Sequence, residues 1–190
     1  MRLFVAIDLD ETAKAAIAEE QRRLKAALGS ARATIKWVRP EHMHLTLVFL
    51  GEVPEARVAP IVDAISRPLA RPPFDLAFGG IGVFPPRGAP NVLWIGAAAG
   101  EAASVDLQRQ LADRIAPHGV QLEQRPFHPH LTLARFKDAR PGDRAAVLAE
   151  GRRGVLATTQ IDHVTLYQSR LSSQGPTYTA MARATLSGSG

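Results

Sequence analysis

One nine-residue segment occurs twice in this chain. Residues 39–47 are RPEHMHLTL and residues 125–133 are RPFHPHLTL, which are identical at seven of nine positions. The identities include histidine and threonine as well as leucine, so a repeated apolar core strand does not explain them. The copies begin 86 residues apart in a chain of 190 residues. We therefore expect two similar halves, each with one copy at the same structural position.

The composition fits a globular domain and limits its chemistry. Cysteine is absent, which excludes disulfides, thiolate zinc sites and a cysteine nucleophile. No apolar run reaches about 18 residues, so we expect no membrane helix and no membrane partner. The apolar part of the opening MRLFVAIDLDE is too short for a signal peptide, which predicts a cytoplasmic protein.

The net charge of +5 has two interpretations. It is typical of a protein with an anionic partner such as RNA. The chain also has 19 arginines against 4 lysines, scattered along its length, which a compositional bias would produce equally well. The charge alone does not decide between the two.

The pattern of apolar residues predicts alternating strands and helices. Strands are expected at 2–9, 34–38, 44–51, 74–86, 91–100, 120–123, 130–136, 154–171 (long or bent) and 175–186. Helices are expected at 11–29, 54–68, 101–119 and 140–151, with Pro60 bending or interrupting the second. This order predicts an α+β fold of two pseudo-symmetric β-α-β-β-α-β lobes, with antiparallel sheets lining a central cleft and helices outside.

The predicted domain organisation is a single bilobal domain over residues 1–186. Its halves are 1–88 and 89–186, divided at the Pro- and Gly-rich segment 85–91, and residues 187–190 are expected to be a flexible tail.

The HLTL part of each copy offers polar groups to one side of a strand. Alternate side chains on a strand share a face, so His44 and Thr46 point one way, as do His130 and Thr132, and the leucines point to a core. Imidazoles titrate near neutral pH, so one can act as an acid and the other as a base. Threonine hydroxyls can donate to phosphate oxygens. Two such sets facing one cleft suit in-line displacement at phosphorus without a metal.

Two alternatives accompany this hypothesis. The histidines can be purely structural, although two matched copies weigh against that. They can also bind zinc, because His42 with His44 and His128 with His130 form two H-x-H pairs. No carboxylate lies in either strand to serve as a base, which weighs against metal catalysis. The remaining histidines, His118 and His163, are expected to be structural or exposed.

With its two H-x-T-x motifs, the chain resembles the two-histidine (2H) phosphoesterase superfamily. It is most similar to the RNA 2′,3′-cyclic phosphodiesterases of the ThpR/LigT group, first named 2′-5′ RNA ligases. The resemblance runs from RLFVAIDL through WVRPEHMHLTLVFLGEV and FHPHLTLARF to LYQSRLSSQGPTY, almost the whole chain. It implies an enzyme without cofactor or metal that opens 2′,3′-cyclic phosphate ends of RNA or oligonucleotides to 2′-phosphates.

The resemblance also implies roles for six residues. The first-motif histidine, His44, is the proton donor, and the second-motif histidine, His130, is the proton acceptor. Thr46, Thr132 and Arg135 bind phosphate, and Phe49 stacks on the terminal base. Phe49 and Arg135 each lie five residues after their histidine, which puts them on the opposite face of a regular strand. A β-bulge or the end of the strand could turn them into the cleft; otherwise Phe49 is a core residue and Arg135 a surface residue.

Other functions stay open at this point. The same centre can act on ADP-ribose cyclic phosphate or 2′-5′ oligonucleotides, or run weak reversible RNA ligation. A different class is an RNA-binding module without turnover. Nothing in the sequence requires more than a monomer.

Overall fold

The computed structural model describes residues 1–29, 33–173 and 175–188. Within these residues the strands are β1 (Arg2–Asp8), β2 (Thr34–Trp37), β3 (His44–Glu52), β4 (Phe74–Phe84), β5 (Val92–Ala99), β6 (His130–Lys137), β7 (Val155–Ile161), β8 (His163–Ser172) and β9 (Gly175–Thr185). The helices are α1 (Glu11–Ala27), α2 (Glu55–Ser66), α3 (Glu101–Ile115) and α4 (Asp143–Ala149), with 3₁₀ turns at Pro40–His42 and Ala116–His118.

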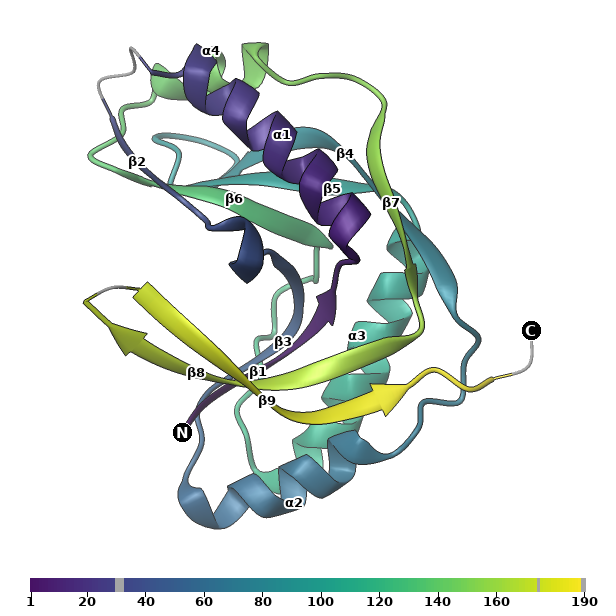
Figure 1. Cartoon of the computed structure of the whole chain (residues 1–190). Helices are drawn as coiled ribbons and strands as arrows, with labels where there is room; N and C mark the ends of the chain where they lie inside the picture. The colour runs from purple at the N-terminus through teal and green to yellow at the C-terminus, as the bar shows by residue number, and fades with distance from the viewer. Residues whose placement is uncertain (30–32, 174, 189–190) are drawn as a thin grey trace.

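The strands form two antiparallel sheets. Sheet A has the order β3-β1-β8-β9 and sheet B has the order β2-β6-β5-β4-β7. Helices α2 and α3 pack on β9 and β3 of sheet A, whereas α1 and α4 pack on β7 and β4 of sheet B (Figure 1). The α+β class with two antiparallel sheets is confirmed. Each sheet carries one HLTL strand, β3 in sheet A and β6 in sheet B.

The strands are distributed differently from the sequence halves. Sheet A includes β8 and β9 from the second half, and sheet B includes β2 and β4 from the first. The segment 154–171, expected to be one long or bent strand, passes from sheet B to sheet A. It is split at Asp162 into β7 of sheet B and β8 of sheet A (Figure 1). The two halves 1–88 and 89–186 therefore exchange strands, and a single hydrophobic core joins the sheets.

The strand predicted at 120–123 was wrong. These residues are irregular, and the next strand begins at His130. Val120 and Leu122 pack against the core, so their alternation reflects burial without strand pairing. Helix α2 continues through Pro60. At the C-terminus, Ser187 and Gly188 donate backbone hydrogen bonds to residues 69 and 71, while residues 189–190 of the expected tail lie outside the described residues.

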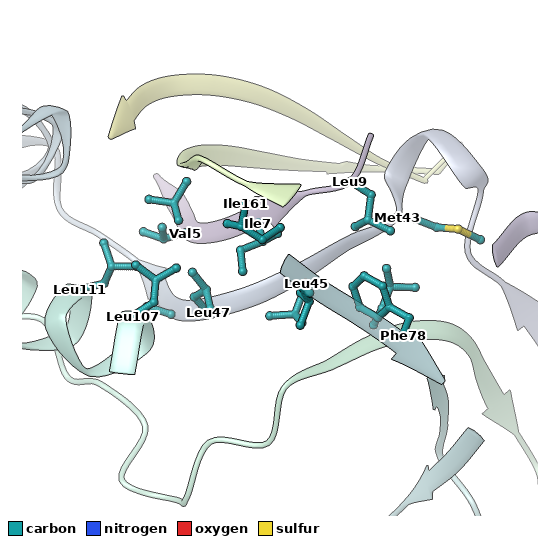
Figure 2. Close-up of a cluster of buried hydrophobic side chains, with 14 of the residues drawn as sticks. Val5, Ile7, Leu9, Met43, Leu45, Leu47, Phe78, Leu107, Leu111 and Ile161 are labelled. Carbon is teal, nitrogen blue, oxygen red and sulfur yellow. The ribbon is translucent and has the colours of Figure 1, made fainter. Parts of the chain in front are cut away.

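The leucines of the repeated segment anchor the two HLTL strands. Leu45, Leu131 and Leu133 are fully buried, and Leu47 is nearly so. Figure 2 shows Leu45 and Leu47 in the cluster that includes Ile7 of β1, Phe78 of β4 and Leu107 of α3. Burying a leucine side chain contributes about 1.5–3 kcal/mol. The core therefore fixes which face of β3 and β6 the histidines and threonines occupy.

Candidate active site

A cleft of about 600 Å³ lies where the two HLTL strands come together. Its lining includes all six residues predicted from the sequence: His44, Thr46, Phe49, His130, Thr132 and Arg135. The three from the first copy lie on β3 of sheet A, and the three from the second lie on β6 of sheet B. Residues separated by 86 positions in the chain thus face one space.

A β-bulge in β3 brings Phe49 to the same face as His44. Against β1, Thr46 pairs with Ala6 and Val48 pairs with Val5, so Leu47 is an extra residue. Both Leu47 and Val48 are buried, and Phe49 is then 44% exposed on the cleft side. One extra residue reverses the alternation of the strand. The conflict between the odd spacing and the cleft position is thereby resolved.

Strand β6 has the same irregularity at the same place. Against β5, Thr132 pairs with Trp94 and Ala134 pairs with Leu93, so Leu133 is the extra residue. Arg135 is exposed and lines the cleft. The buried amide of Gln21 on α1 supports this bulge, because its Nε2 donates to the Leu133 carbonyl at 2.9 Å and to the Val38 carbonyl at 2.7 Å.

Both imidazoles are held by the same local hydrogen bond. Nδ1 of His44 lies 2.8 Å from the carbonyl oxygen of His42, and Nδ1 of His130 lies 2.7 Å from that of His128. A carbonyl only accepts, so each Nδ1 carries the proton and donates it. In each neutral ring Nε2 is therefore the unprotonated nitrogen, able to accept a proton; in a charged ring it can donate one.

Aromatic rings surround each imidazole. Phe4 stacks on His44 at 4.8 Å between ring centroids, and Tyr178 approaches its edge at 5.2 Å. Phe84 meets His130 edge-on at 5.0 Å. Burial among these groups lowers the pKa of both histidines, and the carbonyl hydrogen bonds partly oppose this effect.

The charged side chains outside the repeat that act on the two histidines have opposite signs. The Asp8 carboxylate favours a higher pKa for His44, whereas Arg135 favours a lower pKa for His130. Asp8 is the β1 residue that pairs with His44. The two copies of the repeat are alike in sequence, so this difference comes from outside them.

Hydrogen bonds from β8 fix the Asp8 carboxylate. Thr165 and Tyr167 each donate to it at 2.7 Å. Burial and this bond raise the pKa of Tyr167 to about 12, which keeps the phenol protonated as a donor. Asp8, Phe4 and Tyr178 were not predicted from the sequence as site residues. An acidic residue at the end of the buried segment RLFVAID was a signal, but the pairing of β1 with β3 was needed to place it beside His44.

The other histidines have different surroundings. His42 lines the cleft and meets Tyr178 edge-on at 5.2 Å. His163 lies 2.5 Å from Asp162 and 3.8 Å from Asp8, as expected of a structural histidine. Within residues 1–29, 33–173 and 175–188, no three His, Asp or Glu side chains are grouped to hold a metal ion. None of the helices in the described part of the chain is long and apolar enough to cross a membrane.

The threonines and cations of the cleft are suited to an anion. In the part of the chain that the structure describes, no hydrogen bond engages the hydroxyl of Thr46 or Thr132. The described lining contains four cationic side chains and no carboxylate; the cations are Arg2, Lys36, Arg39 and Arg135. Paired imidazoles, free hydroxyls and positive charge in a cleft between two sheets define a site of the two-histidine phosphoesterase class.

Comparison with known proteins agrees with this class. The family model of the 2′-5′ RNA ligase superfamily matches residues 4–172. An RNA 2′,3′-cyclic phosphodiesterase of Methanothermobacter thermautotrophicus is 36% identical over 183 residues, covering 95% of this chain and 96% of that protein. The chain therefore belongs to the 2′-5′ RNA ligase superfamily, the two-histidine phosphoesterases.

Solved structures show the same fold. A crystal structure of a Thermus thermophilus protein has a TM-score of 0.80 at 30% identity, with 99% of each chain covered. Escherichia coli LigT complexed with 3′-AMP has a TM-score of 0.71 at 26% identity, with 97% of each chain covered.

Proposed function

We propose that this protein hydrolyses 2′,3′-cyclic phosphate ends of RNA to 2′-phosphate ends, by acid–base catalysis from two histidines and without a metal. The observation that carries the proposal is the matched pair of imidazoles lining one cleft, each with Nδ1 held by a carbonyl and Nε2 left for chemistry. The name of the Methanothermobacter relative, an RNA 2′,3′-cyclic phosphodiesterase, supports the substrate.

In the proposed step, water attacks phosphorus opposite the 3′ oxygen. Neutral His130 accepts a proton from the water through Nε2, and protonated His44 donates a proton through Nε2 to the departing 3′ oxygen. A phosphorus–oxygen bond to water forms as the bond to the 3′ oxygen breaks, and the phosphate remains on the 2′ oxygen. After the step His130 is charged and His44 is neutral, so proton exchange with solvent restores the starting state.

The charges around the cleft support this assignment of acid and base. The negative charge of Asp8 favours the protonated form of His44, and the positive charge of Arg135 favours the neutral form of His130. Since burial lowers the pKa of both rings, an anionic phosphate in the cleft would help His44 to hold its proton.

The remaining residues would hold the substrate. The hydroxyls of Thr46 and Thr132 would donate to the non-bridging phosphate oxygens, and Arg135 would neutralise the charge that grows as water attacks. Phe49 would stack on the terminal base, and the Arg2 guanidinium lies 4.9 Å from the centroid of its ring. The complex of LigT with 3′-AMP shows that a relative takes up a nucleoside monophosphate.

The test uses a short RNA with a 2′,3′-cyclic phosphate end, in EDTA. The wild-type protein is expected to release only the 2′-phosphate product. His44→Ala and His130→Ala are expected to lose activity by about 10²–10⁴-fold while remaining folded. His118→Ala is the matched control, because His118 lies outside the cleft lining, and it should retain full activity.

Other outcomes point elsewhere. Full activity in either cleft variant rejects the mechanism, and loss of wild-type activity in EDTA favours the metal alternative. If the protein turns over ADP-ribose cyclic phosphate or a 2′-5′ oligonucleotide but not RNA ends, the catalytic centre is as proposed and the substrate is a different one. RNA binding without any turnover favours a binding module. We also propose that the protein acts as a cytoplasmic monomer. Size-exclusion chromatography with light scattering would test the monomeric state.

A further inference from the structure

Two cations face each other across neighbouring strands at the edge of the cleft. Lys36 of β2 and Arg135 of β6 are direct partners in the antiparallel register, and both line the cleft. Both side chains are exposed. Like charges directly opposite on a sheet destabilise it unless something compensates them.

No carboxylate compensates this pair among the described residues. Neither Lys36 nor Arg135 takes part in an ion pair there, whereas the neighbouring Arg39 has Glu41 at 4.0 Å. The described lining of the cleft contains no acidic residue. The repulsion therefore persists in the free protein, and an anion bridging the two side chains would relieve it.

A single reacting phosphate does not account for both cations. A 2′,3′-cyclic phosphate diester carries one negative charge, and Arg135 and a protonated His44 already oppose it in the proposed function. Lys36 lies further out, on β2, which is an edge strand of sheet B beside β6. The Cβ atoms of such directly opposed residues are about 5 Å apart. The lysine can thus reach a second phosphate beside the first.

We propose that Lys36 forms a subsite for the phosphodiester on the 5′ side of the terminal nucleotide, next to the reacting cyclic phosphate. The cyclic phosphate closes the 3′ end of an RNA chain, so the neighbouring phosphate in the substrate is the one attached to the 5′ oxygen of the same nucleotide. This inference rests on the proposed function and adds to it. The preferred substrate is then an RNA chain of at least two nucleotides, and a cyclic nucleotide without a 5′ phosphate is a weaker one.

Three substrates separate the contribution of that phosphate. They are adenosine 2′,3′-cyclic phosphate, the dinucleotide ApA with a 2′,3′-cyclic end, and the same dinucleotide with an uncharged methylphosphonate linkage. Lys36→Ala should lower kcat/KM about fivefold for the charged dinucleotide, the effect of losing one exposed ion pair. The other two substrates should change by less than about twofold.

Lys25→Ala is the matched control. Lys25 is an exposed lysine in the last turn of α1 and is not among the residues of the cleft lining. Its loss removes the same charge from the protein and should affect no substrate selectively. For the charged dinucleotide, added salt should lower kcat/KM less steeply in Lys36→Ala than in the wild type, because salt screens the attraction that the variant has lost.

The results that would overturn the subsite are distinct from those that would overturn the proposed function. If Lys36→Ala lowers kcat/KM equally for all three substrates, or for none, Lys36 does not bind a second phosphate. The proposed hydrolytic activity is unaffected by that result. If the wild-type protein turns over none of them, the proposed function fails. Binding of fluorescently labelled ApA with a 2′-phosphate end then decides the subsite: weaker binding by Lys36→Ala supports it, and equal binding rejects it.

Discussion

The buried amide of Gln21 provides a direct test of how the second bulge is held. Gln21 is 7% exposed, and its Nε2 donates to the carbonyl of Leu133 at the bulge and to that of Val38 just beyond β2. The Leu133 carbonyl also accepts from the backbone N–H of Val38 at 2.9 Å, so it keeps a partner without the amide. Removing the amide would therefore cost stability mainly at Val38, whose carbonyl would lose its glutamine donor.

The substitution Gln21→Met keeps the length of the side chain and removes the donor. The partly buried Val38 carbonyl, left without its donor, costs about 1–3 kcal/mol of stability, and the shared bond at Leu133 adds about 0.5–1.5 kcal/mol. The expected loss of stability is therefore about 1.5–4.5 kcal/mol. For a chain of this size each kcal/mol lowers Tm by about 2–4 °C, so the melting temperature should fall by at least about 3 °C.

Thermal unfolding followed by circular dichroism measures this effect. Gln124→Met is the control, because Gln124 is exposed and its Nε2 donates at 3.2 Å to the Leu122 carbonyl in an irregular segment; its Tm should be unchanged. A melting temperature of Gln21→Met within about 1 °C of the wild type would refute the reasoning, since the amide would then contribute nothing net to the bulge.

Three further predictions concern the cleft. Thr46→Val and Thr132→Val should each lower kcat/KM by about 10–150-fold, because each loses one hydrogen bond to a charged phosphate. The Tm should not change, because neither hydroxyl bonds a described residue. A fall in Tm that accompanies the fall in kcat/KM would contradict this. Asp8→Asn removes the charge that favours protonated His44, so the pKa of His44 should fall. The alkaline limb of the pH profile of kcat/KM, which reports the acid, should then move to lower pH. A shift of the acidic limb alone would assign His44 as the base. Phe49→Ala should raise KM by about 5–150-fold through lost base stacking, with little change in Tm because the ring is 44% exposed, and an unchanged KM would remove its stacking role.

The repeated segment made much of the site predictable from the sequence. Matched histidines and threonines on strands define a face by alternation alone, and the buried leucines between them confirm that face. The places of Phe49 and Arg135 needed the structure, because a bulge is set by the pairing with β1 and β5 and leaves no clear signal in the strand itself. A bulge was one of two possibilities for each strand, and the pairing registers were needed to place one at the same position in both copies.

The pairing of strands that are distant in the chain could not be predicted from the sequence. The order of elements indicated two sheets, but an apolar strand pattern does not say which partner a strand takes. The exchange of β2, β4, β8 and β9 between the halves therefore escaped prediction. Asp8 and Lys36 escaped for the same reason: each matters because of the residue opposite it, His44 for one and Arg135 for the other.

The central claim, that His44 is the acid and His130 the base, is tested most directly with a leaving group that needs no proton. In 3′-deoxyadenosine 2′-(4-nitrophenyl phosphate), the departing nitrophenolate is stable as an anion, so the acid becomes dispensable while water still needs a base. His44→Ala should lose about 10²–10⁴-fold on the cyclic phosphate yet hydrolyse the nitrophenyl ester at close to the wild-type rate, whereas His130→Ala should fail on both. Rescue of His130→Ala in place of His44→Ala, or equal failure of both variants on both substrates, would contradict the assignment.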